Sequence, residues 1–296
     1  MTRVPLRLSF PAAVLLCALG CAPEQSVSTT DGAPLPVKAR RIVLGMPRYS
    51  AEDAVDATHA LAGYLSNALG IVVDVRMAEP YKELPALLRT GAIDIAQLPP
   101  LAYVHLKQVL PGVVPIATPI AAGSPTYLGH IYVREDSRYR SVADLRGARM
   151  AYVSPESTSG YLFARELLRE KGVDPDQIFI NTRFFGTHQD VLNALVSGEA
   201  DAGASVDSSA GGLVKVERPA GLRVIGKTAR IPHDCVVARD GLDGGTIYAF
   251  RRALLQMRVG EPAAAGVLVA LRLNGWVAAE ESRYDRIRVV LAKEGR

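Results

Sequence analysis

The chain has 296 residues, which is enough for two domains, because most domains contain about 100 to 200 residues. Hydrophobic residues make up 49% and charged residues 22%, a composition that is typical of a folded protein and excludes a disordered or collagen-like chain. The formal net charge is only +4, and no stripe of Lys and Arg is interleaved with aromatic residues. A nucleic-acid-binding surface is therefore not expected.

Residues 1–20 have the pattern of an export signal. A basic start is followed by an apolar run and by small residues just before Cys21. The apolar run is shorter than the roughly 20 residues that a membrane-spanning helix needs, so a cleaved leader is expected. Its removal takes away Arg3 and Arg7 and leaves a net charge of +2. Residues 21–40 are rich in Pro, Ser and Thr without an apolar period, which predicts a flexible tether.

The sequence ALGC at residues 18–21 is similar to the processing site of bacterial lipoproteins, in which the cysteine is lipidated. This resemblance implies a lipid anchor on Cys21 and a membrane-attached, extracytoplasmic protein; plain secretion is the alternative. Cys17 would leave with the leader, so no disulfide within the mature chain is expected. The remaining Cys235 lies in an apolar segment and is predicted to be a buried strand residue, not a nucleophile.

Strands and helices alternate after the tether. Apolar strands are predicted near residues 40–46, 71–77, 93–98, 148–153, 178–185 and 201–206, with a helix after most of them. This alternation favours α/β architecture with a largely parallel sheet that is covered on both faces. The tail, residues 246–257 and 264–277, has helical periodicity throughout and is expected to pack on the first half.

One pattern occurs twice. Residues 81–96 and 188–203 each contain a glycine ten residues after the first position and an aspartate three residues later. The chain is therefore expected to form two similar lobes, in which Tyr81 and His188 occupy the first turn of equivalent helices. Lobe one is expected to comprise residues 41–133 and 236–296.

Lobe two would then comprise residues 134–235. Two apolar segments flanked by polar turns, residues 127–136 and 231–242, would cross between the lobes and act as a hinge. Ligands of open parallel sheets lie beyond the carboxyl ends of the strands, so a cleft between the lobes is the expected binding place.

Three hydroxyl side chains, Ser157, Thr158 and Ser159, stand at the start of a predicted helix over residues 157–172. A single hydroxyl is enough to cap a helix, because one oxygen accepts from a free backbone N–H of the first turn. The surplus hydroxyls and the positive end of the helix dipole would suit a bound anion. An over-decorated helix cap is the alternative.

These residues belong to a set of motifs that resembles a known family. STSGYL at 157–162, residues 186–203, IPHD at 231–234 and RYDRIR at 283–288 together resemble the substrate-binding proteins of ABC importers for phosphonate, phosphite and phosphate. The likeness covers nearly all of the chain after about residue 41. It implies a two-lobed periplasmic-binding-protein fold with a ligand cleft between two α/β domains that are joined by two crossing strands. It also implies a monomer that delivers a small phosphorus oxyanion to an ABC permease in the inner membrane.

The resemblance further implies hydrogen-bond donors to the anion from both lobes: Ser157, Thr158, Ser159 and His188 from lobe two, and Tyr81 and Tyr127 from lobe one. Asp234 would lie at the edge of the cleft and accept from a protonated oxygen or from a ligand amine. Each residue also has a plainer interpretation. His188 could be an ordinary first-turn residue behind the cap Thr187, and the tyrosines could complete a core. Asp234 could pair with an arginine at the surface.

The sequence also bears on functional classes other than an importer. Ser157, His188 and Asp234 could form a hydrolase triad, but the serine lacks the G-x-S-x-G elbow and stands among other hydroxyls, so no enzyme is expected. The five histidines are scattered without ligand spacing, so neither a metal nor a cofactor is expected. A binding protein that reports to a membrane receptor, or one that takes a sulfonate, stays open as an alternative.

Overall fold

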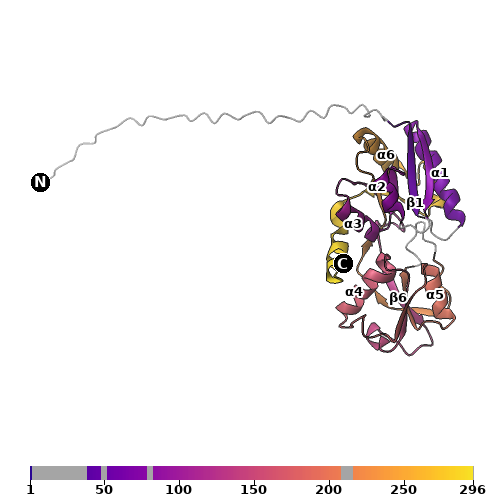
Figure 1. Cartoon of the computed structure of the whole chain (residues 1–296), viewed down its shortest axis with the longest axis vertical. Coiled ribbons are helices and arrows are strands. Elements are labelled where there is room, and N and C mark those ends of the chain that lie inside the picture. Colours follow the sequence, from indigo (N-terminus) through magenta and orange to yellow (C-terminus); the bar gives the residue numbers. More distant parts are fainter. Residues whose placement is uncertain (2–38, 48–51, 79–82, 208–215, 296) are drawn as a thin grey trace. The chain divides into compact units, whose positions relative to one another are not determined.

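The computed structural model describes residue 1 and residues 39–47, 52–78, 83–207 and 216–295 (Figure 1). The leader after residue 1, most of the tether and two candidate site residues, Cys21 and Tyr81, lie outside the described residues. Residues 34–296 form one compact unit, and the hydrophobic clusters described below lie within it.

Two sheets organise the described residues. From edge to edge, the first contains β13 (Gly275–Ala278), β4 (Val114–Ile120), β12 (Cys235–Ala238), β3 (Ile95–Leu98), β1 (Arg41–Pro47) and β2 (Val72–Ala78). The second contains β10 (Leu222–Lys227), β6 (Gly129–Arg134), β9 (Ala202–Val206), β7 (Arg149–Tyr152) and β8 (Asn181–Phe184). The first sheet is the centre of lobe one and the second the centre of lobe two.

The expectation of largely parallel sheets is wrong, because both sheets are mixed. In the first sheet β1 pairs in parallel with β2 and β3, whereas β12 pairs antiparallel with β3 and β4. In the second sheet β7 pairs in parallel with β8 and β9, and β6 pairs antiparallel with β9 and β10. The antiparallel strands β6 and β12 follow the two crossings between the sheets, so each enters its sheet from the opposite direction.

Helices cover both faces of each sheet. On the first sheet, α1 (Glu52–Leu69), α6 (Gly244–Gln256) and α7 (Pro262–Ala270) share one hydrophobic cluster, and α2 (Leu84–Thr90), α3 (Pro100–Val109) and α8 (Asp285–Lys293) share another. On the second sheet, α4 (Phe163–Glu170) covers one face and α5 (His188–Val196) the other. Short turns of helix, η2 (Val142–Leu145), η3 (Thr158–Leu162) and η4 (Glu281–Tyr284), complete the described helices.

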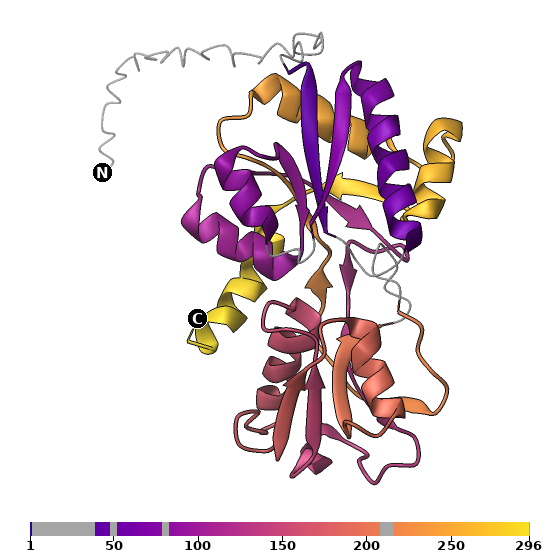
Figure 2. The same ribbon diagram turned by 45° about the vertical axis from the view of Figure 1, so that its right-hand side comes forward.

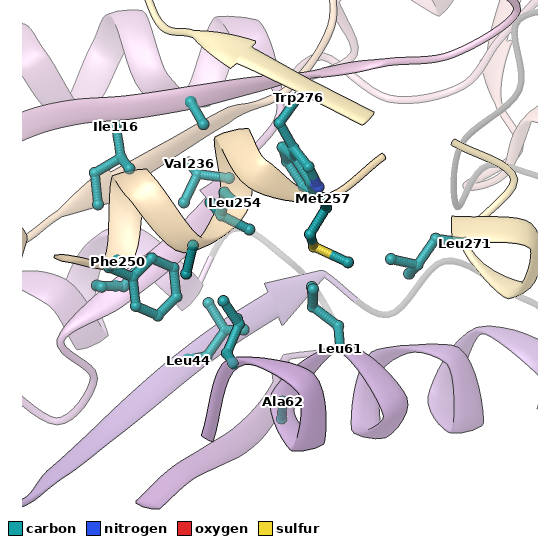
Figure 3. Packing of buried hydrophobic residues seen from close by; sticks show 14 of the residues in the cluster. Leu44, Leu61, Ala62, Ile116, Val236, Phe250, Leu254, Met257, Leu271 and Trp276 are labelled. Atoms are coloured by element: carbon teal, nitrogen blue, oxygen red, sulfur yellow. The ribbon is translucent and has the colours of Figure 1, made fainter. Parts of the chain in front are cut away.

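The core of lobe one is built by α1 and α6 against the first sheet. Figure 3 shows Phe250 and Leu254 of α6 and Trp276 of β13 packed with Leu44 of β1 and Leu61 of α1. Burial of such side chains stabilises a fold by about 1.5–3 kcal/mol each. No helix within the described part of the chain is long and apolar enough to cross a membrane.

The C-terminal tail differs from its expected course. Residues 246–257 and the start of 264–277 are helical, as predicted, but residues Gly275–Ala278 form strand β13 and pair antiparallel with β4. A four-residue apolar run fits a buried strand as well as a helix, and only pairing with a distant strand decides between them.

Two short strands connect the sheets. β5 (Thr126–Tyr127) and β11 (Ile231–Pro232) pair antiparallel with each other, and Figure 2 shows them in the passage between the two sheets. β5 leads from β4 into β6, and β11 leads from β10 back into β12. The domain boundary expected after residue 133 falls inside β6, which pairs with the second sheet along its length.

The repeated aspartates have equivalent structural roles. Asp94 Oδ2 accepts from the backbone N–H of Val43 on β1 at 3.0 Å, and Asp201 Oδ2 accepts from the backbone N–H of Arg149 on β7 at 2.9 Å. Each carboxylate also bonds to an arginine, Arg239 or Arg149. The aspartate of the repeat therefore anchors the central parallel strand of its sheet.

Candidate functional site

The hydroxyl row, Ser157 to Ser159, lies where β7 leads into helix. Its first turn, η3, is a π-helical turn, and α4 begins only at Phe163. Ser157 is the N-cap of η3, and its Oγ accepts from Gly160 N at 3.0 Å. Ser157 thus caps η3, and its own hydroxyl hydrogen can still be donated to another group. Single π-helical turns occur often at functional sites.

Thr158 reaches across to lobe one. Its Oγ1 accepts from Leu101 N at 3.1 Å, and the contact is buried. Leu101 offers the first backbone N–H of α3, because Pro99 and Pro100 have none. The hydroxyl of Thr158 therefore caps α3, the helix that follows β3 in the other lobe. Two helix starts, one from each lobe, consequently meet at this residue.

Ser159 is joined to the crossing strands. Tyr127 of β5 donates its hydroxyl to Ser159 Oγ at 3.5 Å, and Ser159 itself is buried. The Tyr127 ring stacks on His233, with ring centroids 5.0 Å apart and an interplanar angle of 27°. Tyr127 is thus in contact with the hydroxyl row, and its donation to an anion stays a prediction.

His188 is the first residue of α5, and its ring contacts the carboxyl end of β9. Thr187 caps the helix by accepting from Asp190 N at 3.0 Å, so the plainer interpretation of this segment as a capped helix start is also present. The Nδ1 atom of His188 accepts from Val206 N at 3.2 Å, which places the ring proton of neutral His188 on Nε2.

Burial lowers the pKa of His188 to about 4, so the ring is neutral at pH 7. In that state it offers one N–H donor and no net charge. A neutral donor can hydrogen-bond an anion without forming an ion pair, and the donation expected of His188 from the sequence stays a prediction.

Asp234 lies between β11 and β12. Gln97 at the end of β3 donates from Nε2 to Asp234 Oδ2 at 2.9 Å, and the carboxylate is half-buried. The nearby Arg239, five residues along the chain, bonds to Asp94. The amide of Gln97 thus holds the carboxylate beside the crossing strands.

The contacts group the candidate residues in three places. Thr158 and Ser159 bond to Leu101 and Tyr127, whereas His188 bonds to the end of β9 and Asp234 to Gln97. Ser157 and His188 have different hydrogen-bond partners, Gly160 N and Val206 N, so the serine is not joined to a base in the way that a hydrolase triad requires.

Three further residues belong to this region although none of them was predicted as a site residue. Gln97 holds Asp234, and Asp207 directly follows β9 beside the end of the strand that contacts His188. His233 is 9% exposed, and its Nε2 has no hydrogen-bond partner among the described residues. For Gln97 and Asp207 the only signal was the position at a strand end, whereas His233 lies in the IPHD motif beside Asp234.

Cys235 behaves as the sequence predicts. It is fully buried at the start of β12, and burial raises the pKa of its thiol to about 12. A thiol with such a pKa stays protonated at neutral pH and is a poor nucleophile.

A family model and several known proteins match this chain. A model of the family described as "ABC transporter, phosphonate, periplasmic substrate-binding protein" matches residues 43–284. The chain belongs to this family. Its members are binding proteins of transport systems and not enzymes, so the expectation that the chain is not an enzyme is confirmed.

Individual relatives are distant. The phosphate-import protein PhnD of Mycolicibacterium smegmatis is 24% identical over 243 residues, which cover 78% of this chain and 75% of the relative. The structure of PhnD1 from Prochlorococcus marinus in complex with methylphosphonate has a TM-score of 0.75 at 19% identity and covers 86% of this chain and 98% of that one.

The binding-protein component of an ABC phosphonate transporter from Pseudomonas aeruginosa has a TM-score of 0.71 at 21% identity, with 85% of each chain covered. These likenesses confirm the periplasmic-binding-protein fold. The protein is therefore the substrate-binding component of a phosphonate-type ABC transporter.

Proposed function

We propose that the protein captures a small phosphorus oxyanion, a phosphonate, phosphite or phosphate, between its two lobes and delivers it to an ABC permease. The observation that carries this proposal is the hydroxyl row at the start of η3, which meets α3 through Thr158 and the hinge strand β5 through Ser159. A ligand held at this row would touch both lobes and the hinge, so its binding would couple to closure.

The donors suit an anion that must later be released. Hydroxyl groups, the neutral His188 ring and the amide end of η3 are all uncharged donors. Such groups stabilise a phosphoryl group through hydrogen bonds and helix dipoles, without the desolvation of a full countercharge. When the lobes separate, the anion keeps only part of these contacts, and its affinity falls.

Each candidate residue has a role in this proposal. Ser157, Thr158, Ser159 and His188 donate to the phosphoryl oxygens. Tyr81 donates from lobe one, and Tyr127 does so by turning its single hydroxyl hydrogen from Ser159 Oγ to the anion. Asp234 accepts from a protonated oxygen or a ligand amine, and Gln97 orients its carboxylate.

Calorimetry on residues 34–296 tests the proposal, since this unit contains the four hydrophobic clusters. The panel comprises methylphosphonate, a phosphonate with an amine, phosphite, phosphate and methanesulfonate. A ligand at 100 times its Kd stabilises the native state by about 2.7 kcal/mol, so thermal shift gives an independent readout. Tight binding of one phosphorus oxyanion supports the proposal; selective binding of the sulfonate, or of none, contradicts it.

Variants of His188 sharpen this test. His188→Leu removes the donor and is expected to weaken binding by about 1.5–3 kcal/mol, as for hydrogen bonds to charged groups, which is about tenfold or more. His188→Gln retains an N–H donor and should lose less. Thr90→Ala removes an exposed hydroxyl of α2, far along the chain from the row, and should leave affinity unchanged.

The membrane attachment is proposed from the leader alone. Lipidation of Cys21 would tether the protein at the extracytoplasmic face near its permease. Mass spectrometry of the membrane fraction should find a diacylated cysteine at residue 21, and Cys21→Ala should release the protein. An unmodified Cys21 in a protein free in solution would exclude the anchor.

A further inference from the structure

The C-terminal helix α8 belongs to lobe one by its packing. Its apolar side chains Ile287, Val290 and Leu291 are buried in the same hydrophobic cluster as α2 and α3. Charged side chains of α8 nevertheless bond to lobe two. Arg286 in its first turn bonds to Glu170 of α4, and the C-terminal end of α8 with Lys293 and Glu294 lies beside α4 (Figure 1).

Ion pairs fasten this end of α8 to α4. Arg165 Nε donates to Glu294 Oε2 at 3.1 Å, and Arg169 also bonds to Glu294. Lys293 Nζ lies 2.5 Å from Glu166 Oε1. Arg165 donates through a second nitrogen to Asp176 Oδ1 at 2.7 Å. We call these six residues the α8–α4 cluster: Glu166, Asp176 and Glu294 with Arg165, Arg169 and Lys293.

The cluster is balanced and partly buried. It contains three carboxylates and three cations, and the side chains of Arg165, Glu166 and Glu294 are 8%, 4% and 5% exposed. A buried charge that loses its partner is strongly destabilising, because its desolvation is no longer compensated. The pairs that cross between α8 and α4 therefore favour the arrangement of the lobes in which they form.

The same helix α4 continues directly from the hydroxyl row. Leu162 and Phe163, at the junction of η3 and α4, are buried in the hydrophobic cluster of α3 and α8. Thr158, four residues before Leu162, caps α3. The cluster, the shared apolar contacts and the cap thus form one continuous connection between the lobes, separate from the crossing strands β5 and β11.

We propose that the α8–α4 cluster is an interlobe clamp whose residues position the hydroxyl row against α3. Glu294 and Lys293 act through α4 and need not touch the ligand. The clamp rests on the proposed function only for its effect on anion affinity, since the fastening itself consists of bonds within the protein. Without it, lobe two samples arrangements in which Thr158 no longer meets Leu101.

Distances between spin labels test the clamp without any ligand. One label is placed on α1 of lobe one through His59→Cys, and the other on α5 of lobe two through Val196→Cys, both exposed positions. The native Cys235 is fully buried and does not compete for the label. Pulsed electron spin resonance on residues 34–296 then gives the interlobe distance distribution.

The variants are Glu294→Gln, which removes the carboxylate that joins Arg165 and Arg169 to the end of α8, and the milder Lys293→Met. The matched control is Glu199→Gln, which breaks an exposed pair with Arg183 within lobe two. We expect Glu294→Gln and Lys293→Met to broaden the distribution or move its mean, and the control to superimpose on the parent. Folding is checked by thermal unfolding, and Lys293→Met decides the matter if Glu294→Gln does not fold.

Unchanged distributions in both folded clamp variants would overturn the proposal, because a merely structural cluster would lower the melting temperature alone. Anion affinity gives the second readout. If clamp loss leaves a tenth of the molecules in the binding-competent arrangement, the apparent Kd rises about tenfold. If the clamp variants shift the interlobe distances but the parent binds none of the anions, the proposed ligand is refuted and the clamp stands. If the parent binds an anion tightly but the variants leave the distances unchanged, the clamp is refuted and the proposed ligand stands.

Discussion

Gly160, the fourth residue of the STSG motif, has no room for a side chain. A Cβ built on it would lie 2.3 Å from Val153 Cγ2 and 2.9 Å from Ser157 Oγ. Val153 is buried and β-branched, so its χ1 angle has little freedom to move the methyl group away. Its backbone N–H also donates to Gly160 O at 3.1 Å, which fixes the two segments together. Gly160→Ala must therefore displace η3 from the end of β7.

Overpacking of this kind costs about 1–3 kcal/mol, and each kcal/mol lowers the Tm of a domain of this size by about 2–4 °C. Because the displaced turn carries the hydroxyl row, anion affinity should fall as well. Gly63→Ala is the matched control: Gly63 is exposed on α1 with nothing within 4 Å of its Cβ position, so alanine should stabilise by about 0.5–1 kcal/mol.

Urea unfolding and calorimetry of the two variants on residues 34–296 measure both effects. The prediction is opposite signs of stability change and weaker anion binding in Gly160→Ala alone. Equal stabilisation by both alanines would show that η3 does not pack closely on Val153, and would refute the account of the hydroxyl row.

Three further predictions concern the same region. Tyr127→Phe keeps the ring on His233 and removes the hydroxyl that reaches Ser159, so calorimetry should find anion binding weaker by about 0.5–1.5 kcal/mol; unchanged affinity would remove Tyr127 from the site. Thr158→Val leaves the buried Leu101 N–H without its acceptor and should cost about 1–3 kcal/mol in urea unfolding, whereas Thr158→Ser should restore most of it. Burial lowers the pKa of His233 to about 4, below the ordinary 6.5, so its contribution to stability is complete above pH 6.5 and is lost as pH falls towards 4. The loss is on the order of 3 kcal/mol, and His233→Gln should flatten this part of the pH profile of unfolding; an unchanged profile would contradict the burial argument.

The local elements could be predicted because their signals are local. The apolar strands, the helix stops and the repeated aspartate follow from patterns of a few residues, and the repeat proved to reflect the equivalent bonds of Asp94 and Asp201 to β1 and β7. The sheet directions could not be predicted in this way. β12 and β13 come from far along the chain, and their antiparallel pairing depends on partners that no local pattern specifies.

The candidate site also has a part that local sequence patterns predict and a part that depends on contacts between distant segments. A cluster of three hydroxyls before a helix is visible in the sequence, and Ser157 and Thr158 proved to be caps, one for η3 and one for α3. That Thr158 caps a helix of the other lobe requires the fold, since residues 101 and 158 lie 57 positions apart and meet only where the two lobes come together. Gln97 carries no pattern, because a lone polar residue beside an apolar strand has many ordinary explanations, and the IPHD motif that contains His233 assigned a role only to Asp234.

The most direct test of the central claim is a crystal structure with the tightest binder of the oxyanion panel. The account predicts phosphoryl oxygens within hydrogen-bond distance, about 2.5–3.2 Å, of the hydroxyl row and of His188 Nε2, with both lobes in contact with the ligand. An anion bound elsewhere, with Ser157, Thr158 and Ser159 engaged only as helix caps, would contradict it.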